Sequence, residues 1–361
     1  MIPVTKTYLP PLENYTSQLE RIWQDGQVTN NGVLIRELED SLKQYLNIPN
    51  IELVANGTLA LQLAIKALGL KGEVITTPYS YVATTTAIIW EHCTPIFVDI
   101  EDKTFCIDAD KIEKAITERT TAILATHVYG YPCEVEKIEK IAKKYSLKVI
   151  YDGAHAIGVK LNGQSILSYG DATTLSFHAT KLFHTTEGGA LVCRDKELAE
   201  KVDLMKKFGH IGEEKYLEVG INAKMSEVHA AMGLCVLPKV NEIIANRRAI
   251  SERYHDLLKD CDLFLPQISA KSEYNYAYFP VIFKTYSQMM KVRQSLIDNN
   301  IMPRRYFYPS LNTLKYLGSK SKQKCPVSES IAERVLCLPL YYDLGFNTVE
   351  KVCSVIVKTL K

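Results

Sequence analysis

The 361-residue chain lacks the compositional marks of several protein classes. Its formal net charge is only +2 and its pI is about 7.9, below the pI of ~9 or more that indicates a nucleic-acid-binding domain. No apolar run approaches the ~20 residues that span a bilayer. The nine cysteines form no CxxC pair and no signal peptide is recognisable, which favours a reduced protein over a disulfide framework. We therefore expect a soluble, cytoplasmic protein that binds neither nucleic acid nor membrane.

Internal repeats and low-complexity segments are also absent, and no GxGxxG motif follows a predicted strand. The missing glycine motif weighs against a nicotinamide-dependent dehydrogenase. What is present is ordinary: a hydrophobic content of 47% and a charged content of 23% are typical of a globular protein. The length predicts about two domains.

Predicted strands and helices alternate up to about residue 193, which is typical of an α/β domain with a largely parallel sheet. Beyond Arg194 long helices dominate, and Pro238 should kink or split the helix predicted over 226–248. We place the domain boundary at this bend. The prediction is a large domain over residues 1–240, which opens with an extended arm, and a smaller C-terminal α+β domain over residues 241–361.

The stretch from Ala172 to Cys193 holds the most informative lysine of the chain. It reads as two short apolar strands joined by a polar turn, and Lys181 lies in that turn. A lysine held between buried strands is costly unless it is paired, neutral or covalently used. Lysine forms Schiff bases with carbonyl cofactors once its pKa is lowered. The alternative is a solvated hairpin loop with an ordinary surface lysine.

A second stretch makes the functional interpretation of Lys181 stronger. Residues 149–151 are predicted to form a buried strand, and Asp152 falls where that strand ends. Ser176 occupies the equivalent position on a strand that we expect to be a neighbour, and ligands of open α/β sheets collect at such strand ends. Pyridoxal phosphate (PLP) needs this pairing, because a lysine carries it covalently and an aspartate keeps its pyridine nitrogen protonated.

Two strand-to-helix junctions are further candidates for cofactor binding. Gly57 and Thr58 open a predicted helix, whose first N–H groups are unpaired donors suited to a phosphate. The alternative there is that Asn56 simply caps the helix. Tyr81 begins another helix and is a candidate for stacking on a flat ring, although such a tyrosine is more often part of the core.

Several histidines could in principle be metal ligands. No pair shows helical or zinc-finger spacing, so we predict no metal. His178 and His184 flank Lys181 closely enough to act near a substrate. The histidines considered are His127, His178, His184, His210 and His229.

Five motifs, in order along the chain, resemble those of the DegT/StrS family of sugar aminotransferases. They are NGTLALQLA, TPYSYVATTT, YDGAHAIG, SFHATKLFHTTEGGA and GINAKMSEVHAAMGL. The resemblance covers nearly the whole chain and implies a PLP-dependent transferase of the aspartate aminotransferase type, fold type I. Some related dehydratases have histidine in place of the lysine, so Lys181 favours transamination.

The resemblance implies a role for each matching residue. Lys181 would carry the cofactor and move the proton between the cofactor carbon and the sugar carbon. Asp152 would face the pyridine nitrogen and His155 the phenolic oxygen. Asn222 would reach the phosphate of the neighbouring subunit, which implies a homodimer with shared active sites. The remaining cofactor contacts would be Tyr81 on the ring and Gly57, Thr58 and Ser176 on the phosphate.

The resemblance also bears on the substrates. Family members generally take a keto sugar linked to a nucleoside diphosphate, with L-glutamate as the usual amino donor. Guanidinium groups pair with pyrophosphate and aromatic rings stack on bases, although a solvated charged loop would have the same composition. The candidates for this contact are Arg304, Arg305, Tyr306 and Tyr308.

Within the family, the opening IPVTKTYLPPLENY and the segment RRYFYPSLNTL most resemble enzymes that aminate dTDP-4-keto-6-deoxyglucose at C4. Such a product, dTDP-4-amino-4,6-dideoxyglucose, serves surface polysaccharide synthesis, such as the O-antigen of lipopolysaccharide. The alternatives are amination at C3 of a dTDP-3-keto sugar and amination of a UDP sugar. A further alternative is a non-catalytic scaffold on the same fold, but a scaffold needs neither Lys181 nor Asp152.

Overall fold

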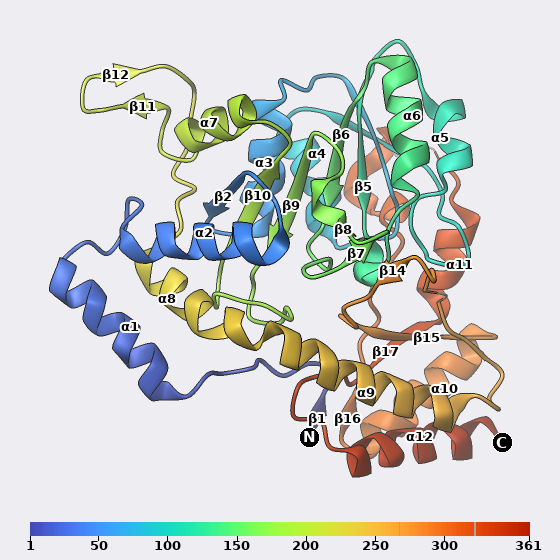
Figure 1. Cartoon of the computed structure of the whole chain (residues 1–361). Helices are drawn as coiled ribbons and strands as arrows, with labels where there is room; N and C mark the ends of the chain where they lie inside the picture. Colours follow the sequence, from blue (N-terminus) through green and yellow to red (C-terminus); the bar gives the residue numbers. More distant parts are fainter. Residues whose placement is uncertain (267, 321–322) are drawn as a thin grey trace.

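The computed structural model describes residues 1–266, 268–320 and 323–361 and is built around a seven-stranded sheet (Figure 1). The spatial order of the strands is β2–β10–β9–β6–β5–β3–β4. All neighbours are parallel except β10, which runs antiparallel to both β2 and β9. The largely parallel sheet is therefore confirmed. The strands are β2 (Ile51–Val54), β3 (Glu73–Thr76), β4 (Thr94–Phe97), β5 (Thr120–Thr126), β6 (Lys148–Asp152), β9 (Ala172–Ser176) and β10 (Gly189–Cys193).

Helices cover both faces of this sheet, because alternate strand residues are apolar on both sides. On β5, Ile123 and Ala125 join one core cluster while Ala122 and Leu124 join the other. The first cluster packs against α2 (Val33–Leu46), α6 (Val135–Tyr145) and α8 (Glu227–Val236). The second packs against α3 (Gly57–Ala67), α4 (Val82–Trp90) and α7 (Lys196–Met205). The result is a three-layer α/β/α arrangement.

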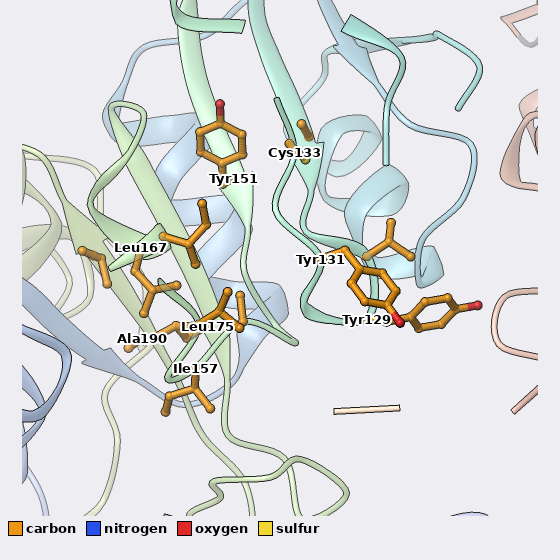
Figure 2. Close-up of a cluster of buried hydrophobic side chains, with 14 of the residues drawn as sticks. Tyr129, Tyr131, Cys133, Tyr151, Ile157, Leu167, Leu175 and Ala190 are labelled. Carbon is orange, nitrogen blue, oxygen red and sulfur yellow. The ribbon is translucent and has the colours of Figure 1, made fainter. Parts of the chain in front are cut away.

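The same alternation decides toward which face of the sheet the last side chain of each strand points. Tyr151 and Leu175 belong to the first cluster, part of which Figure 2 shows with Leu175 beside Leu167, Ile157 and Ala190. Successive side chains of a strand point to opposite faces. Asp152 and Ser176, which come next, are therefore directed to the face covered by α3 and α4.

A second, smaller body of structure follows α8. Pro238 lies in the 3₁₀ turn η3 (Leu237–Lys239), which separates α8 from α9 (Val240–Leu258), so the split predicted at this proline is confirmed. Beyond it the antiparallel sheet β13–β15–β17 packs with α9, α10 and α12 around their own core cluster. These elements are β13 (Leu263–Phe264), β15 (Phe279–Phe283), α10 (Tyr286–Asp298), α11 (Pro326–Arg334), β17 (Val335–Leu338) and α12 (Phe346–Leu360).

The run from Glu227 to Leu258 is long and apolar enough to cross a membrane by composition. In the fold it serves as a core helix: Val236 and Ile243 belong to the first cluster and Ile250 to the small C-terminal cluster. Packing within the chain accounts for part of its apolar character, since 39% of its most apolar window is buried.

The N-terminal arm is extended, as predicted, and joins the two bodies. Its strand β1 (Ile2–Pro3) pairs in parallel with β16 (Ile301–Met302) of the C-terminal part. The helix α1 (Leu12–Asp25) then packs against α8. A hairpin of β11 (His210–Ile211) and β12 (Lys215–Tyr216) projects from the molecule beyond α7 (Figure 1).

All nine cysteines are free. The remaining short elements are α5 (Ala109–Ala115), η1 (Val128–Gly130), β7 (Lys160–Leu161), β8 (Gln164–Ser165), η2 (Ile166–Ser168), β14 (Ser272–Glu273), η4 (Leu311–Thr313) and η5 (Lys315–Lys320).

Candidate active site

A cavity of about 290 Å³ lies where β2, β3, β6 and β9 end, next to the N-termini of α3 and α4. This is the edge of the sheet at which ligands of open α/β proteins collect. It is lined by residues from both bodies of the fold. They are Asn56, Gly57, Thr58, Leu61, Ser80, Tyr81, Ala83, Asp152, Ala154, His155, Thr174, Leu175, Ser176, His178, Thr180, Lys181, Glu187, Tyr278, Tyr306 and Phe307.

Lys181 reaches this cavity from the loop between β9 and β10. Its side chain is half-buried, and burial lowers the pKa of the amine to about 8, against the opposing influence of Asp152 and Tyr81. With that pKa roughly a tenth of the amines are neutral at pH 7, far more than for an ordinary lysine. A neutral amine is the form that attacks a carbonyl carbon, so Lys181 is chemically prepared for covalent attachment.

Asp152 is buried at the end of β6, beside Thr174 of β9. Its Oδ2 accepts a hydrogen bond of 2.7 Å from the Thr84 hydroxyl, and its Oδ1 accepts one of 3.1 Å from the Ala154 N–H. Burial raises the pKa of the Asp152 carboxyl, while these two hydrogen bonds and the nearby Lys181 act to lower it. The geometry thus provides a carboxylate with a donor on each oxygen.

His155 is buried against two aromatic rings of the C-terminal part. Its ring stacks on Phe307 with a centroid distance of 5.6 Å and meets Tyr278 edge-on at 5.0 Å. Burial holds the pKa of His155 well below the usual range for histidine, so the ring is neutral. Among the residues that the structure describes, the Nδ1 of His155 has no hydrogen-bond partner. A buried ring nitrogen without a protein partner is available to a ligand or to an ordered water.

The N-terminus of α3 forms a tight cradle. Asn56 caps the helix by accepting a hydrogen bond of 2.9 Å from the Leu59 N–H, so the structural alternative predicted for this turn is correct. The cradle itself depends on glycine, because a Cβ on Gly57 would lie 3.0 Å from the Cβ of Ser176. A Cβ on Gly189 would come within 2.7 Å of the Gly57 nitrogen. The first N–H groups of α3 and the Ser176 hydroxyl can therefore surround an anion.

Tyr81 borders the cavity at the start of α4 and is 59% exposed, so its ring is accessible to a ligand rather than part of the core. His178 and Tyr306 also line the cavity. His178 is exposed, and its Nε2 lies 3.6 Å from a carboxylate oxygen of Glu187. Tyr81 and His178 are thus exposed parts of the wall, and Tyr306 is half-buried.

Other residues singled out in the sequence lie elsewhere in this chain. His184 is buried, and its Nε2 donates a hydrogen bond of 2.6 Å to the Tyr8 carbonyl in the N-terminal arm. Arg305 donates to the carbonyls of Ala332 and Glu333, near the end of α11, and lies 3.4 Å above the ring of Tyr308. None of these side chains lines the cavity.

Arg304 and Asn222 are exposed and are also outside the cavity of their own chain. Asn222 forms a β-bridge with Lys207 near the base of the β11–β12 hairpin. Within the described ranges no group of three His, Cys, Asp or Glu side chains is arranged to hold a metal ion.

Sequence reasoning missed several residues of the site. Thr84 was not identified, although it contacts Asp152 directly, and neither were Tyr278 and Phe307, which come from distant segments. The i, i+4 spacing of Ser80 and Thr84 at a helix start was a possible signal for the first. No local pattern marks the two aromatic residues, because only the tertiary fold brings them to His155.

Comparison with known proteins adds independent information. A sequence profile of the DegT/DnrJ/EryC1/StrS aminotransferase family matches residues 12–357. The dTDP-4-amino-4,6-dideoxy-D-glucose transaminase of Shigella dysenteriae is 44% identical over 359 residues, covering 98% of this chain and 97% of the relative. The Escherichia coli protein of the same name is 41% identical, with coverages of 99% and 98%.

A solved structure agrees with these sequence matches. The crystal structure of DesI in the presence of its TDP-sugar product superposes with a TM-score of 0.93 at 30% identity. The match covers 100% of this chain and 93% of DesI.

Proposed function

This chain belongs to the DegT/DnrJ/EryC1/StrS aminotransferase family, and we propose that it aminates dTDP-4-keto-6-deoxy-D-glucose at C4. It is an enzyme of the transaminase type. In the proposed reaction L-glutamate gives its amino group and leaves as 2-oxoglutarate, and the sugar becomes dTDP-4-amino-4,6-dideoxy-D-glucose. The observation that carries the choice of sugar is the 44% identity, over nearly the full length of both chains, to a transaminase named for that product.

The residues of the cavity fit PLP, on which the family depends. The α3 cradle suits its phosphate, the exposed ring of Tyr81 suits its flat face, and the unpartnered Nδ1 of His155 suits its phenolic oxygen. The Asp152 carboxylate, whose Oδ2 accepts a hydrogen bond from Thr84, suits a protonated pyridine nitrogen. When bound, PLP supplies an electron-withdrawing ring that stabilises negative charge on the carbon undergoing amination.

The residues of this chain have separate tasks in the proposed mechanism. Lys181 would hold the cofactor through its Nζ, and its amine would accept and donate the proton that moves during the exchange. Its pKa of about 8 suits both accepting and donating that proton near neutral pH. Asp152 keeps the ring nitrogen protonated, because a carboxylate beside it favours the cationic form.

We also propose a homodimer with shared active sites. Lys181 and His178 are the only basic side chains besides His155 among the described lining residues, which is little positive charge for a nucleoside diphosphate. Asn222, proposed to reach the partner's cofactor phosphate, is exposed next to the hairpin. The segment that precedes it in the sequence carries apolar side chains that are exposed in the single chain: Phe208, Ile211, Tyr216, Leu217, Val219 and Ile221. A second copy covering them would bring Asn222 to the neighbouring cavity.

The remaining substrate contacts are assigned by proximity and chemistry. His178 and Tyr306 line the cavity, and Arg304 is exposed on the same segment as Tyr306. Arg305, Tyr308 and His184 stay in the proposed substrate set, although in the single chain they contact other protein groups. We further propose a cytoplasmic location and a role in supplying amino sugars for surface polysaccharide such as O-antigen.

Product analysis tests this proposal. The purified enzyme, PLP and L-glutamate would be incubated separately with dTDP-4-keto-6-deoxyglucose, a dTDP-3-keto-6-deoxyhexose and a UDP-4-keto sugar, and NMR would locate the new C–N bond. We expect the dTDP-4-keto sugar to be aminated at C4 with the highest kcat/KM. A higher kcat/KM for either of the other substrates would contradict the assignment and favour the corresponding alternative.

A further inference from the structure

A row of three buried hydroxyl groups leads through the protein to Asp152. The Thr126 hydroxyl, at the end of β5, lies 3.1 Å from the Ser80 hydroxyl, which lies 2.8 Å from that of Thr84. Thr84 in turn lies 2.7 Å from Oδ2 of Asp152. All four side chains are buried, with exposed fractions between 0% and 6%. The row therefore runs along the carboxyl ends of the strands, from the last residue of β5 to the carboxylate, through side chains that are almost fully buried.

The direction of the hydrogen bonds follows from the carboxylate at the end of the row. An ionised carboxylate can only accept, so Thr84 must donate its proton to Asp152. The Thr84 oxygen then accepts from Ser80, and Ser80 accepts from Thr126. Hydrogen bonds that all point the same way polarise one another and strengthen the last one. Thr84 is thus the donor to Oδ2 of Asp152, and Ser80 and Thr126 fix the direction of its hydroxyl.

We propose that Thr84, supported by Ser80 and Thr126, is a positioning residue that keeps Asp152 ionised and turned toward the pyridine nitrogen. This inference rests on the proposed function, since it assigns Thr84 a task toward the cofactor. It is independent of which sugar is the substrate. Neither Thr84 nor Thr126 lines the cavity, so neither residue touches the ligand directly.

The role of Thr84 follows from the proton that Asp152 and the pyridine nitrogen would share. A donor to the Asp152 carboxylate lowers its affinity for a proton, so the proton stays on the ring nitrogen. Without Thr84, Oδ2 would be left buried with no protein donor, and only the 3.1 Å hydrogen bond from Ala154 would remain on Oδ1. Burial would then favour the neutral acid, which cannot stabilise a cationic ring.

The chain offers a matched control for this test. Thr85 is the next residue of α4, is fully buried, and its hydroxyl has no hydrogen-bond partner among the described residues. Thr84→Val and Thr85→Val make the same chemical change one position apart. Only the first removes the donor to Asp152. Thr84→Ser keeps a hydroxyl and should rescue the function.

The experiment measures the affinity of each apoenzyme for PLP and for 1-deaza-pyridoxal phosphate, in which carbon replaces the ring nitrogen. We expect Thr84→Val to weaken PLP binding about ten- to hundredfold, as for the loss of a hydrogen bond to a charged group. Binding of the deaza analogue should be unchanged, because it has no ring nitrogen for Asp152 to contact. Thr84→Ser and Thr85→Val should bind both compounds like the wild type.

A double-mutant cycle separates this role from a purely structural one. In an Asp152→Asn background Thr84→Val should have no further effect on PLP affinity, because the donor would act only through the carboxylate. An equal loss in that background, or an equal loss of affinity for the deaza analogue, would overturn the proposal. Should Thr84→Val fail to fold, Thr126→Val removes the far end of the row and is expected to show the same selectivity for PLP with a smaller loss. If the wild-type apoenzyme bound no PLP at all, the proposed function would fall instead.

Discussion

At the scale of single residues, the chemistry depends on the state of one amine. Lys181 lies in a loop between two strands of the sheet, close to Asp152 and Tyr81, and burial lowers its pKa to about 8. Asp152 opposes this shift but does not cancel it. The amine is therefore available as a nucleophile near neutral pH, while it remains close enough to a carboxylate to be charged again.

The lowered pKa predicts how covalent loading depends on pH. A lysine that becomes neutral through pH 8 should attach PLP faster as the pH rises from 6 to 8, and the rate should level off above pH 8 to 9. The rate of appearance of the visible absorbance band after mixing apoenzyme with PLP measures this directly. A rate that rises without a plateau up to pH 10, as expected for an ordinary lysine, would contradict the structural account of Lys181.

Site residues could be predicted where a local sequence pattern marks them, and not where only the fold reveals their partners. Lys181 and Asp152 were recognisable because strand ends are visible in the sequence and the two residue types together match one cofactor. The structure brings both to one cavity, but their roles remain proposals. Arg305 illustrates what sequence could not show: its guanidinium is taken up by carbonyls of α11, and only the fold reveals those partners.

At the scale of elements, the start of α3 depends on a close approach between its backbone and strands β9 and β10. The helix begins directly against β9 and β10, and a methyl group on Gly57 would press against Ser176, which would have to shift by a few tenths of an ångström. Gly189 of β10 has the same property on the other side of the turn. The two glycines allow three backbone segments to meet around the proposed phosphate site.

Gly57→Ala tests this cradle. The added Cβ would lie 3.0 Å from the Ser176 Cβ and displace either the serine or the first turn of α3. We expect PLP affinity to fall about tenfold through this overpacking, measured by titration of the apoenzyme. Gly345→Ala is the control, because Gly345 also lies at the start of a helix, as the N-cap of α12, has φ −67° and would meet nothing within 4 Å. Unchanged PLP affinity in Gly57→Ala would exclude the α3 cradle as the phosphate site.

Most elements of the sheet were predictable because they are long or strongly apolar, such as β5 over Thr120–Thr126. The antiparallel pairing of β10 with β9 agrees with the hairpin offered as the alternative for this stretch, whereas its pairing with β2 was not predictable from a short apolar run. Two-residue strands such as β13 and β14 were also missed. They carry no periodicity, and their existence depends on partners far away in the chain.

At the scale of the whole molecule, the cavity depends on both bodies of the fold. The large sheet provides Lys181 and Asp152, and the C-terminal part provides Tyr278, Tyr306 and Phe307. The N-terminal arm links the two: β1 pairs with β16, and the Thr7 hydroxyl donates a hydrogen bond of 2.9 Å to the Ala179 carbonyl, two residues before Lys181. The division at residue 240 remains a prediction, and catalysis as proposed needs residues from both sides of it.

In the proposed function Lys181 binds PLP, and the enzyme exchanges an amino group with L-glutamate. The most direct measurement is the absorbance spectrum of the purified protein with PLP, before and after L-glutamate, for the wild type and Lys181→Ala. We predict a visible band in the wild type that gives way to the spectrum of the amino form of the cofactor, and no covalent band or exchange in Lys181→Ala. A wild-type protein that stays colourless with added PLP, or a Lys181→Ala variant that responds to glutamate like the wild type, would contradict the account.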